Sequence, residues 1–329
     1  MPTRRLLVTA AVIIGLTPLG ALGALAQEKD WPTGPIHVYV GFPAGSSPDT
    51  LARIITEPLA QRLGQPVVVE NKAGAGGVIG VQQMLAARRD DHAFGVTING
   101  PLTTAARLTP DLGYDVASDI APVALIATSP LVLAMAQDAG PTDVAGFIDA
   151  AKAEPEAISY GSVGQGSGAH LTAELFAEAA GVRMLHVPFS SYAEVTTSIL
   201  GHEIDAGFMA PSAALPHVEA GTMKILGVTS TEPFPLLPEI PVMAGKAGLP
   251  EDFNAELWNA FIAPAGTDPA VIGRLNTEIN MILADPAVQA KLLDMGWQAQ
   301  GGTPADLAAR IGKDTALWGA VIDRTGAAD

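Results

Sequence analysis

The chain has 329 residues, of which 48% are hydrophobic and 16% are charged, so it can bury a large core and does not have the composition of a disordered protein. It contains no cysteine, which excludes disulfides and thiolate metal sites. Its formal net charge of -16 makes nucleic acid and anionic membrane surfaces poor partners, because both carry dense negative charge.

The first 26 residues have the layout of a secretory signal peptide. Arg4 and Arg5 precede an apolar run over residues 6–16, and the Ala-Leu-Ala sequence that ends at Ala26 fits the small-residue motif of a cleavage site. An uncleaved membrane anchor is the alternative, but Pro18 interrupts the apolar stretch. We expect cleavage near Ala26 and export to the periplasm.

The next part of the sequence alternates strands and helices. Apolar segments predict strands at 36–43, 66–72 and 93–100, and the spacing of apolar residues predicts helices at 51–64 and 81–89. Such alternation is typical of a parallel sheet that is covered by helices.

A second run of the same kind follows the apolar segment 121–139. It predicts strands at 157–162, 183–189, 204–211 and 223–230, with helices at 143–155, 171–181, 192–203 and 212–221. A proline-rich connection and a helical tail complete the chain. We therefore expect an α/β protein with two lobes, each a mostly parallel sheet flanked by helices. The expected first lobe is 27–129 with 254–329, and the second is 130–253.

Three loops between a strand and a helix are rich in glycine and serine. They are FPAGSSPDT at 42–50, NKAGAGGVIG at 71–80 and GSVGQGSGAH at 161–170. The first backbone N–H groups of a helix lack partners inside the helix and bind anions, and glycine lets a ligand approach them closely. A tight turn also needs glycine, so one loop alone is weak evidence. Together, at the carboxyl ends of strands, they predict an anion site between the lobes.

Other site chemistries find little support. Residues 164–169 fit the pattern G-x-G-x-x-A, but no acidic residue follows at the end of the next strand, and no phosphate-binding loop occurs. The six histidines lack metal-ligand spacing, so we expect neither metal nor cofactor. An exported hydrolase or transferase that uses a loop serine with His170 stays open as an alternative, although no G-x-S-x-G motif is present.

Four kinds of side chain near these loops have candidate roles. Asp49 stands at a helix start, where it can cap the helix and so order its own loop. His170 either donates a hydrogen bond to a ligand oxygen or closes the loop. Asp205 either accepts a hydrogen bond from the ligand or anchors an N–H group of a loop. An apolar wall is expected from Phe42, Phe189, Tyr192 and Met209.

Several of these motifs resemble the solute-binding receptors of tripartite tricarboxylate transporters, the Bug family. The resemblance rests on FPAGSSPDTLARIITEPLAQRLGQPVVVENKAGAGGVIG, ISYGSVGQGSGAHLTAELF, GHEIDAGF, LPEIPVMAGKAGLP and FIAPAGTDPAVIGRLNTEIN, which follow in the order of the family. It implies a type II-like periplasmic binding protein, expected to be monomeric, whose lobes close on a small organic carboxylate. Such a ligand would be a di- or tricarboxylate, an aromatic acid or a similar acid. The expected partners are membrane permease subunits or a sensor, and no nucleic acid.

The resemblance also implies which residues contact the ligand. In the family, backbone groups and waters of two loops hold a carboxylate, and these loops correspond here to residues 44–49 and 162–170. With neighbouring strand ends included, the candidate ligand-binding residues are Phe42, Ala44, Gly45, Ser46, Ser47, Asp49, Ala75, Asn99, Ser162, Gly164, Gln165, Gly166, Ser167, His170, Phe189, Tyr192, Asp205 and Met209.

The sequence departs from the family pattern at three places. Ser46 stands where the first loop commonly has a second glycine. Residues 189–192 read FSSY instead of the usual Y-K-G-G, so a lysine is missing, and residues 209–211 read MAP in place of an acidic-amide pair. These changes favour a ligand whose distal group is less polar than that of a tricarboxylate.

Overall fold

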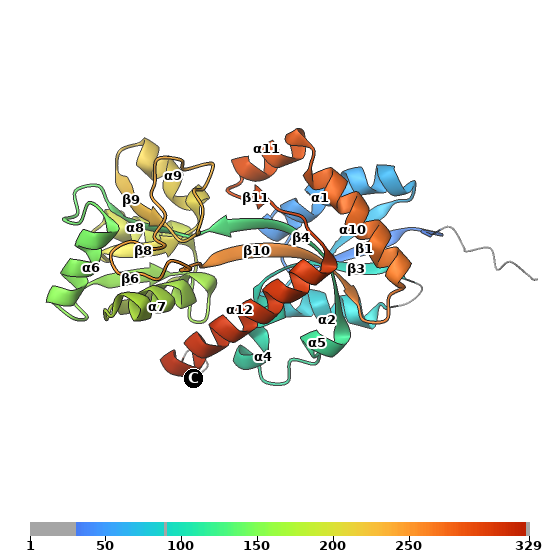
Figure 1. Ribbon diagram of the computed structural model, residues 1–329, viewed down its shortest axis with the longest axis horizontal. Coiled ribbons are helices and arrows are strands. Elements are labelled where there is room, and N and C mark those ends of the chain that lie inside the picture. The colour runs from blue at the N-terminus through green and yellow to red at the C-terminus, as the bar shows by residue number, and fades with distance from the viewer. Residues whose placement is uncertain (1–30, 89–90, 327–329) are drawn as a thin grey trace, which may run out of the picture. The chain divides into compact units, whose positions relative to one another are not determined.

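Two β-sheets organise the protein, which is represented by a computed structural model that describes residues 31–88 and 91–326 (Figure 1). The elements below belong to one compact unit, Pro32–Asp329. The expected signal peptide lies outside the described residues. None of the helices in the described ranges combines the length and apolar character needed to cross a membrane.

The first sheet has six strands in the order β11-β4-β10-β3-β1-β2. Its strands are β1 (Ile36–Val40), β2 (Val67–Asn71), β3 (Ala93–Ile98), β4 (Ile120–Pro130), β10 (Glu256–Pro264) and β11 (Gln298–Ala299). Strand β1 pairs in parallel with β2 and β3, whereas β10 runs antiparallel to β3 and β4. We call this sheet and its helices the first lobe.

The second sheet has five strands in the order β7-β6-β8-β5-β9. Its strands are β5 (Val132–Ala136), β6 (Ser159–Ser162), β7 (Leu185–Pro188), β8 (Ala206–Met209) and β9 (Met223–Val228). Strand β6 pairs in parallel with β7 and β8, but β5 is antiparallel to β8 and β9. This sheet and its helices are the second lobe.

Both sheets are therefore mixed, although the sequence predicts mostly parallel ones. The antiparallel ladders arise where the chain passes between the sheets. Strand β4 ends at Pro130 in the first sheet, and β5 begins two residues later in the second. Strand β10 brings the chain back into the first sheet beside β4. The connecting strands β10 and β5 are therefore antiparallel to their neighbours, whereas the strands joined by helices are parallel to each other.

Helices pack against the sheets. They are α1 (Ser47–Leu63), η1 (Ala75–Gly77), α2 (Val78–Ala86), α3 (Gly100–Thr103), α4 (Ala105–Leu108), α5 (Val116–Asp119), α6 (Val144–Ala153), α7 (Gly168–Ala180), α8 (Tyr192–Leu200), α9 (Pro211–Glu219), α10 (Pro269–Leu283), α11 (Pro286–Asp294) and α12 (Pro304–Thr325). Local signals set many starts, because a serine, threonine or aspartate side chain caps the first turn of α6, α7, α8 and α12.

Helix α12 belongs to the first lobe but reaches the second. A capping box between Thr303 and Asp306 starts it, and it packs along β4 and α3. Its last turns form an apolar cluster with α7, in which Trp318 and Ile322 meet Leu171. An ion pair between Arg324 and Glu178 joins the same two helices. The C-terminal helix therefore packs on the first sheet and also touches the second lobe.

Candidate ligand-binding site

A pocket of about 580 Å³ is lined by loops of both lobes. The first lobe contributes the loop after β1, the short η1 turn, the segment after β3 and helix α4. The second lobe contributes the loop between β6 and α7 and the start of α8. Its walls also include Leu257 of β10 and Trp318 of α12. A concave site of this size suits a small organic molecule.

The N-terminus of α7 presents free backbone donors to this pocket. Ser167 is the N-cap, and its Oγ accepts a hydrogen bond from the backbone N–H of His170 at 3.3 Å. The two N–H groups between them, those of Gly168 and Ala169, have no acceptor within the described residues. Both residues line the pocket. Orphan amides at the positive end of a 13-residue helix make a site for an anion.

Two glycines of this loop leave room for leucines from the first lobe. A Cβ atom at Gly166 would lie 3.1 Å from Leu108 Cδ1, and one at Gly168 would lie 2.6 Å from Leu257 Cδ2. Gly166 also has a φ of 70°, a conformation that side chains rarely adopt. The apolar side chains therefore lie directly against the turn that carries the amide donors.

A polar cluster of Ser162, His170 and His186 supports the backbone of the same loop. Ser162 Oγ lies 2.7 Å from His186 Nε2 and accepts the N–H of Gly164 at 3.2 Å. The rings of His170 and His186 stack with centroids 4.1 Å apart. His170 Nδ1 accepts the N–H of Gly166 at 3.1 Å. The cluster therefore holds the backbone of the loop in place.

Both imidazoles of this cluster are biased toward the neutral form. Burial lowers the pKa of His170, which is 5% exposed. Burial, and then the charge of the neighbouring His170, lower the pKa of His186 to about 4. His170 closes the loop, which is the second of the two roles that the sequence leaves open for it.

The loop at 42–49 is ordered by Asp49. Its carboxylate accepts the N–H of Gly45 and the Nδ2 of Asn71, both at 2.8 Å, and the Nε of Arg53 at 3.1 Å. Burial acts to raise the pKa of Asp49, but these hydrogen bonds outweigh it and the pKa lies below its ordinary value. Asp49 therefore orders its own loop, but it does not cap the helix, because Ser46 is the N-cap of α1 and no side chain caps its first turn.

The structure brings together only some of the predicted contact residues. Those that line the pocket are Phe42, Ala75, Asn99, Gly166, Ser167 and Tyr192. Ser162, Gly164 and His170 support the loop behind it, and Gln165 is exposed. Ala44, Gly45, Ser46 and Ser47 are outside the lining, and Ser47 Oγ accepts the indole N–H of Trp297 at 2.8 Å.

Three predicted residues of the second lobe lie away from the pocket lining. Phe189 and Met209 pack in the core of that lobe. Asp205 stands before β8, and its carboxylate accepts the N–H and Oγ of Ser159 at 2.8 and 2.7 Å. Ser159 starts β6, whereas the binding loop follows the end of β6. Asp205 therefore anchors a backbone N–H at the opposite edge of the sheet, the second of the two roles considered for it.

Four lining residues carry no signal that sequence patterns could have revealed. Leu108, Leu257 and Trp318 are ordinary apolar residues in their elements, and Glu256 starts a strand. The pocket gathers them from segments that are far apart in the chain. Within residues 31–88 and 91–326, no group of three histidine, aspartate or glutamate side chains lies close enough together to hold a metal ion.

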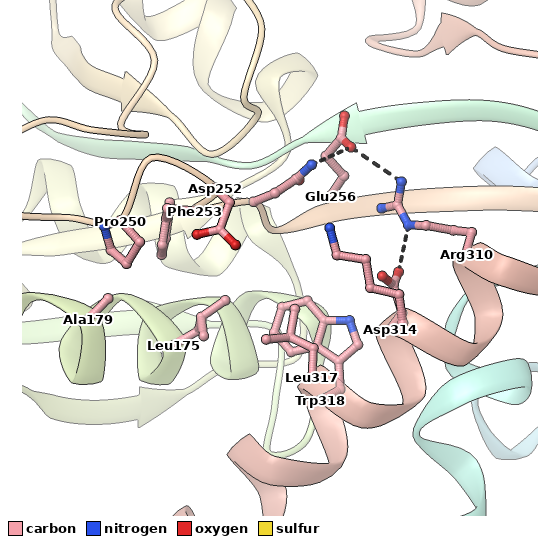
Figure 2. A pocket seen from close by; sticks show the side chains of 12 residues that line it. Leu175, Ala179, Pro250, Asp252, Phe253, Glu256, Arg310, Asp314, Leu317 and Trp318 are labelled. Carbon is pink, nitrogen blue, oxygen red and sulfur yellow. Dashed lines mark hydrogen bonds and ion pairs between the residues drawn. The ribbon is translucent and has the colours of Figure 1, made fainter.

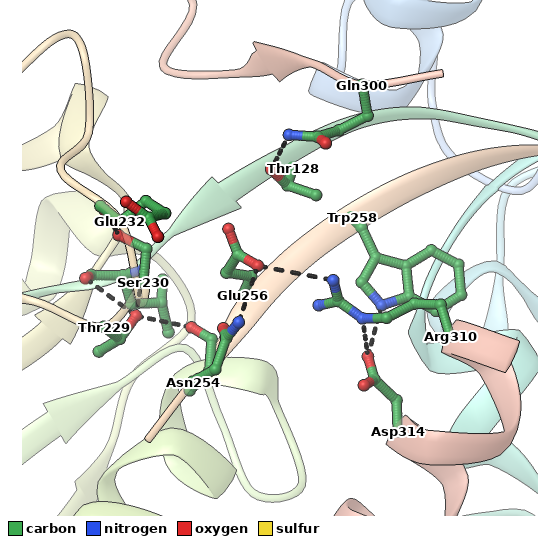
Figure 3. A network of polar contacts seen from close by, with 12 residues as sticks. Thr128, Thr229, Ser230, Glu232, Asn254, Glu256, Trp258, Gln300, Arg310 and Asp314 are labelled. Atoms are coloured by element: carbon green, nitrogen blue, oxygen red, sulfur yellow. Dashed lines mark hydrogen bonds and ion pairs between the residues drawn. The ribbon is translucent and has the colours of Figure 1, made fainter. Parts of the chain in front are cut away.

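Behind the pocket, a polar network ties the two strands that connect the lobes (Figure 3). Thr229, which is fully buried, donates its Oγ1–H toward the carbonyl of Ala255 at 2.6 Å and lies 2.8 Å from the N–H of Leu131. Leu131 follows β4 and Ala255 precedes β10. The side chain of Thr229, which follows β9, therefore links both places where the chain passes between the sheets, Leu131 and Ala255.

A second cavity of about 210 Å³ lies beside this network, between α7, α12 and residues 250–256 (Figure 2). Arg310 pairs with Asp314 at 2.9 Å and with Glu256 at 3.5 Å, and Asp314 also accepts the indole N–H of Trp258 at 2.6 Å. Glu256 and Trp318 line this cavity as well as the larger pocket. They form the wall between the two.

Comparisons with a family model and with individual proteins indicate the same family. Residues 51–327 match the family model described as tripartite tricarboxylate transporter family receptor, TctC. A Pseudomonas protein from the tcbD-tcbE intergenic region is 35% identical over 298 residues, which are 90% of this chain and 88% of that protein. Protein BugT of Bordetella pertussis is 32% identical over 99% of both chains.

Solved structures agree with the fold. The R. palustris protein Rpa4515, determined with adipate, is 31% identical with a TM-score of 0.75, over 90% of this chain and 99% of that chain. MatC from Rhodopseudomonas palustris, with bound malate, is 28% identical with a TM-score of 0.71, over 89% of this chain and all of that chain. The predicted two-lobed α/β binding-protein fold is confirmed. The chain belongs to the tripartite tricarboxylate transporter family of receptors, together with the Bug proteins.

Proposed function

We propose that this protein is a periplasmic receptor that captures a small organic carboxylate by closure of its two lobes. It then delivers the ligand to the membrane permease of a tripartite tricarboxylate-type transporter. The observation that carries the proposal is the pair of unpartnered amides, Gly168 and Ala169, at a helix N-terminus in a pocket lined by both lobes. Relatives solved with adipate and malate, and the signal-peptide pattern, support it.

In this proposal, four donors around the α7 N-terminus bind the carboxylate. The N–H groups of Gly168 and Ala169 point out of the first turn, and the Ser167 hydroxyl lies beside them. From the first lobe, Asn99 lines the pocket and its side-chain amide has no partner in the described ranges. Each charge-assisted hydrogen bond contributes about 1.5–3 kcal/mol. Surface charges beyond ~8 Å are largely screened at physiological salt, so these local donors outweigh the net charge of -16.

The loop Ala44–Asp49 is proposed as a first-lobe contact that acts through main-chain groups and bridging waters, as the family resemblance implies. Ser46 Oγ supports this, because it is buried and lacks a partner in the described part of the chain. A buried hydroxyl without a protein partner is satisfied by a bound water or a ligand atom.

Lobe closure is proposed to bend the chain at the two crossings. The proposed division assigns 27–129 and 254–329 to the first lobe and 130–253 to the second. It is supported by the strand order, since β4 and β10 lie in one sheet and β5 and β9 in the other. Few residues connect the sheets at Leu131 and Ala255, so a small change of dihedral angles there moves one lobe relative to the other.

The same geometry favours a receptor over a hydrolase. Ser162 is fully buried and bonded to His186, and Ser167 Oγ caps α7. His170 Nδ1 is occupied by the N–H of Gly166. Ser162 therefore has an imidazole partner but is out of reach of a substrate, and Ser167 has no hydrogen bond to an imidazole in the described residues.

The direct test is a thermal-shift screen of residues 27–329 with carboxylic acids and, as matched controls, their uncharged methyl esters. A receptor is stabilised by about 2.7 kcal/mol at a hundredfold excess over Kd. The acids should raise the melting temperature, and they should be recovered intact. Turnover of the esters, with no shift from any acid, would support the hydrolase and reject the proposal.

A further inference from the structure

The lining of the pocket contains few charged groups. Its lining includes no lysine, arginine or histidine among the residues described, and its single carboxylate is that of Glu256. Glu256 is already paired with Arg310 at 3.5 Å and accepts the Nδ2 of Asn254 at 3.2 Å. The amides at the start of α7 are therefore the main attraction for an anion, and the nearest fixed side-chain charge is negative.

Two other helices of nine residues begin at the pocket, and neither provides a second anion site. At the start of α2, the N–H groups of Val78 and Ile79 are already bonded to the carbonyls of Ala75 and Gly74. Tyr192, the first residue of α8, lines the pocket. Glu194 lies in the first turn of this helix, and its carboxylate accepts the N–H of Ser190 at 2.9 Å. The dipole of α8 is thus matched by a carboxylate of the chain itself. Burial raises the pKa of the Tyr192 phenol, so this group stays neutral and adds no charge.

The remaining wall is mostly apolar, and Thr104, Thr109 and Thr172 add hydroxyls to it but no charge. Phe42, Ile98 and Leu108 face the pocket from the first lobe, and Val163 and Leu257 lie beside the loop of the second. A carboxylate buried among such side chains, without a cation, loses its hydration and gains nothing in return. A hydrocarbon group in the same place gains affinity with each methylene that leaves water.

We infer that the physiological ligand is a monocarboxylate with a hydrocarbon body, aliphatic or aromatic, and that dicarboxylates bind weakly. The inference rests on the proposed function and narrows its ligand class. The carboxylate lies at the α7 N-terminus, and the hydrocarbon body fills the space between Phe42, Leu108 and Leu257. The relatives solved with adipate and malate hold acids with two carboxylates, so this chain differs from them in the chemistry of the distal end.

The sharpest test compares hexanoate with adipate, which share a six-carbon chain and differ only in a terminal methyl or carboxylate. Calorimetry with residues 27–329 should give hexanoate an affinity at least ~100-fold higher, because the second carboxylate of adipate would be buried without a cation. Benzoate and cyclohexanecarboxylate should also bind. Adipate, malate or citrate binding as tightly as hexanoate overturns the inference while leaving the proposed function intact. Binding of no acid at all rejects both.

The variant Glu256→Gln tests the charge argument separately. Removing this carboxylate should reduce the preference for hexanoate over adipate by about 10-fold, a value typical of one charge near a protein surface. Any effect on hinge motion acts on both acids and cancels in the ratio. The matched control is Glu219→Gln, at an exposed position at the end of α9 outside the pocket, which should leave the ratio unchanged. An unchanged ratio in Glu256→Gln would overturn the inference.

Discussion

The N–H group of Gly168 can be removed without removing the helix. Proline is favoured at the first position of a helix, where its missing N–H has no intrahelical partner. The preceding residue, Ser167, has φ -65° and ψ 159°, which is the extended conformation that proline requires before it. Gly168→Pro should therefore fold with α7 intact and lack one ligand donor.

The new side chain needs its own control, because a Cβ at this position would approach Leu257 Cδ2 to 2.6 Å. Gly168→Ala introduces the same Cβ but keeps the N–H. The two variants therefore share the steric effect on Leu257 and differ in the donor. One charge-assisted hydrogen bond contributes about 1.5–3 kcal/mol, so proline should bind a carboxylate about 10- to 150-fold more weakly than alanine.

The assay is calorimetric titration of both variants with the acid that gives the largest thermal shift, after circular dichroism has shown equal helix content. Equal affinities of the proline and alanine variants would mean that the N–H of Gly168 does not contact the carboxylate. The anion would then have to be placed elsewhere, and the central observation of the proposed function would be lost.

Three further predictions concern the supports of the pocket. The pKa of His186 is lowered to about 4 in the folded protein, so the unfolded chain binds more protons below pH 6.5; stability should be complete above that pH and decrease as the pH falls toward 4. His186→Gln should flatten this dependence in thermal melts, whereas His202→Gln, at an exposed site, should not. Thr229→Val should destabilise the protein by about 1–3 kcal/mol in urea denaturation, because buried backbone groups at both crossings lose their partner, and Thr229→Ser should be near wild type. Trp318 lines the pocket, so Trp318→Phe should lose most of the fluorescence change on ligand binding; a change of unaltered size would place the ligand away from α12.

Local signals made the binding loop predictable. The strand that ends at Ser162 and the glycines that follow it are encoded within a few residues, although α7 begins at Gly168, three residues before the predicted helix 171–181. The N-cap preference of serine and the positive φ of Gly166 act at this short range. The same holds for Asp49, whose partner Gly45 is four residues away. For such features the sequence pattern and the structure agree.

Features that depend on tertiary contacts were not accessible in this way. Asp205 illustrates the problem at a strand end, because the predicted strand 204–211 includes it, whereas β8 begins at Ala206. A shift of two residues places its carboxylate beside Ser159, at the amino edge of the sheet. Leu108 and Trp318 meet the binding loop only because α4 and α12 fold against it. No local spacing encodes such an encounter.

The wall between the two cavities gives a physical reason for coupling ligand binding to lobe closure. Glu256 and Trp318 line the ligand pocket on one side and the second cavity, between α7, α12 and residues 250–256, on the other. Trp318 belongs to a helix of the first lobe and packs on Leu171 of α7, the helix whose N-terminus is proposed to bind the carboxylate. A ligand stabilises the closed form only by the amount that it binds that form more tightly than the open one. In the proposed mechanism, a hydrocarbon body that contacts Trp318 while its carboxylate bonds to α7 makes favourable contacts with both lobes at once, which an acid too short to reach the wall cannot do.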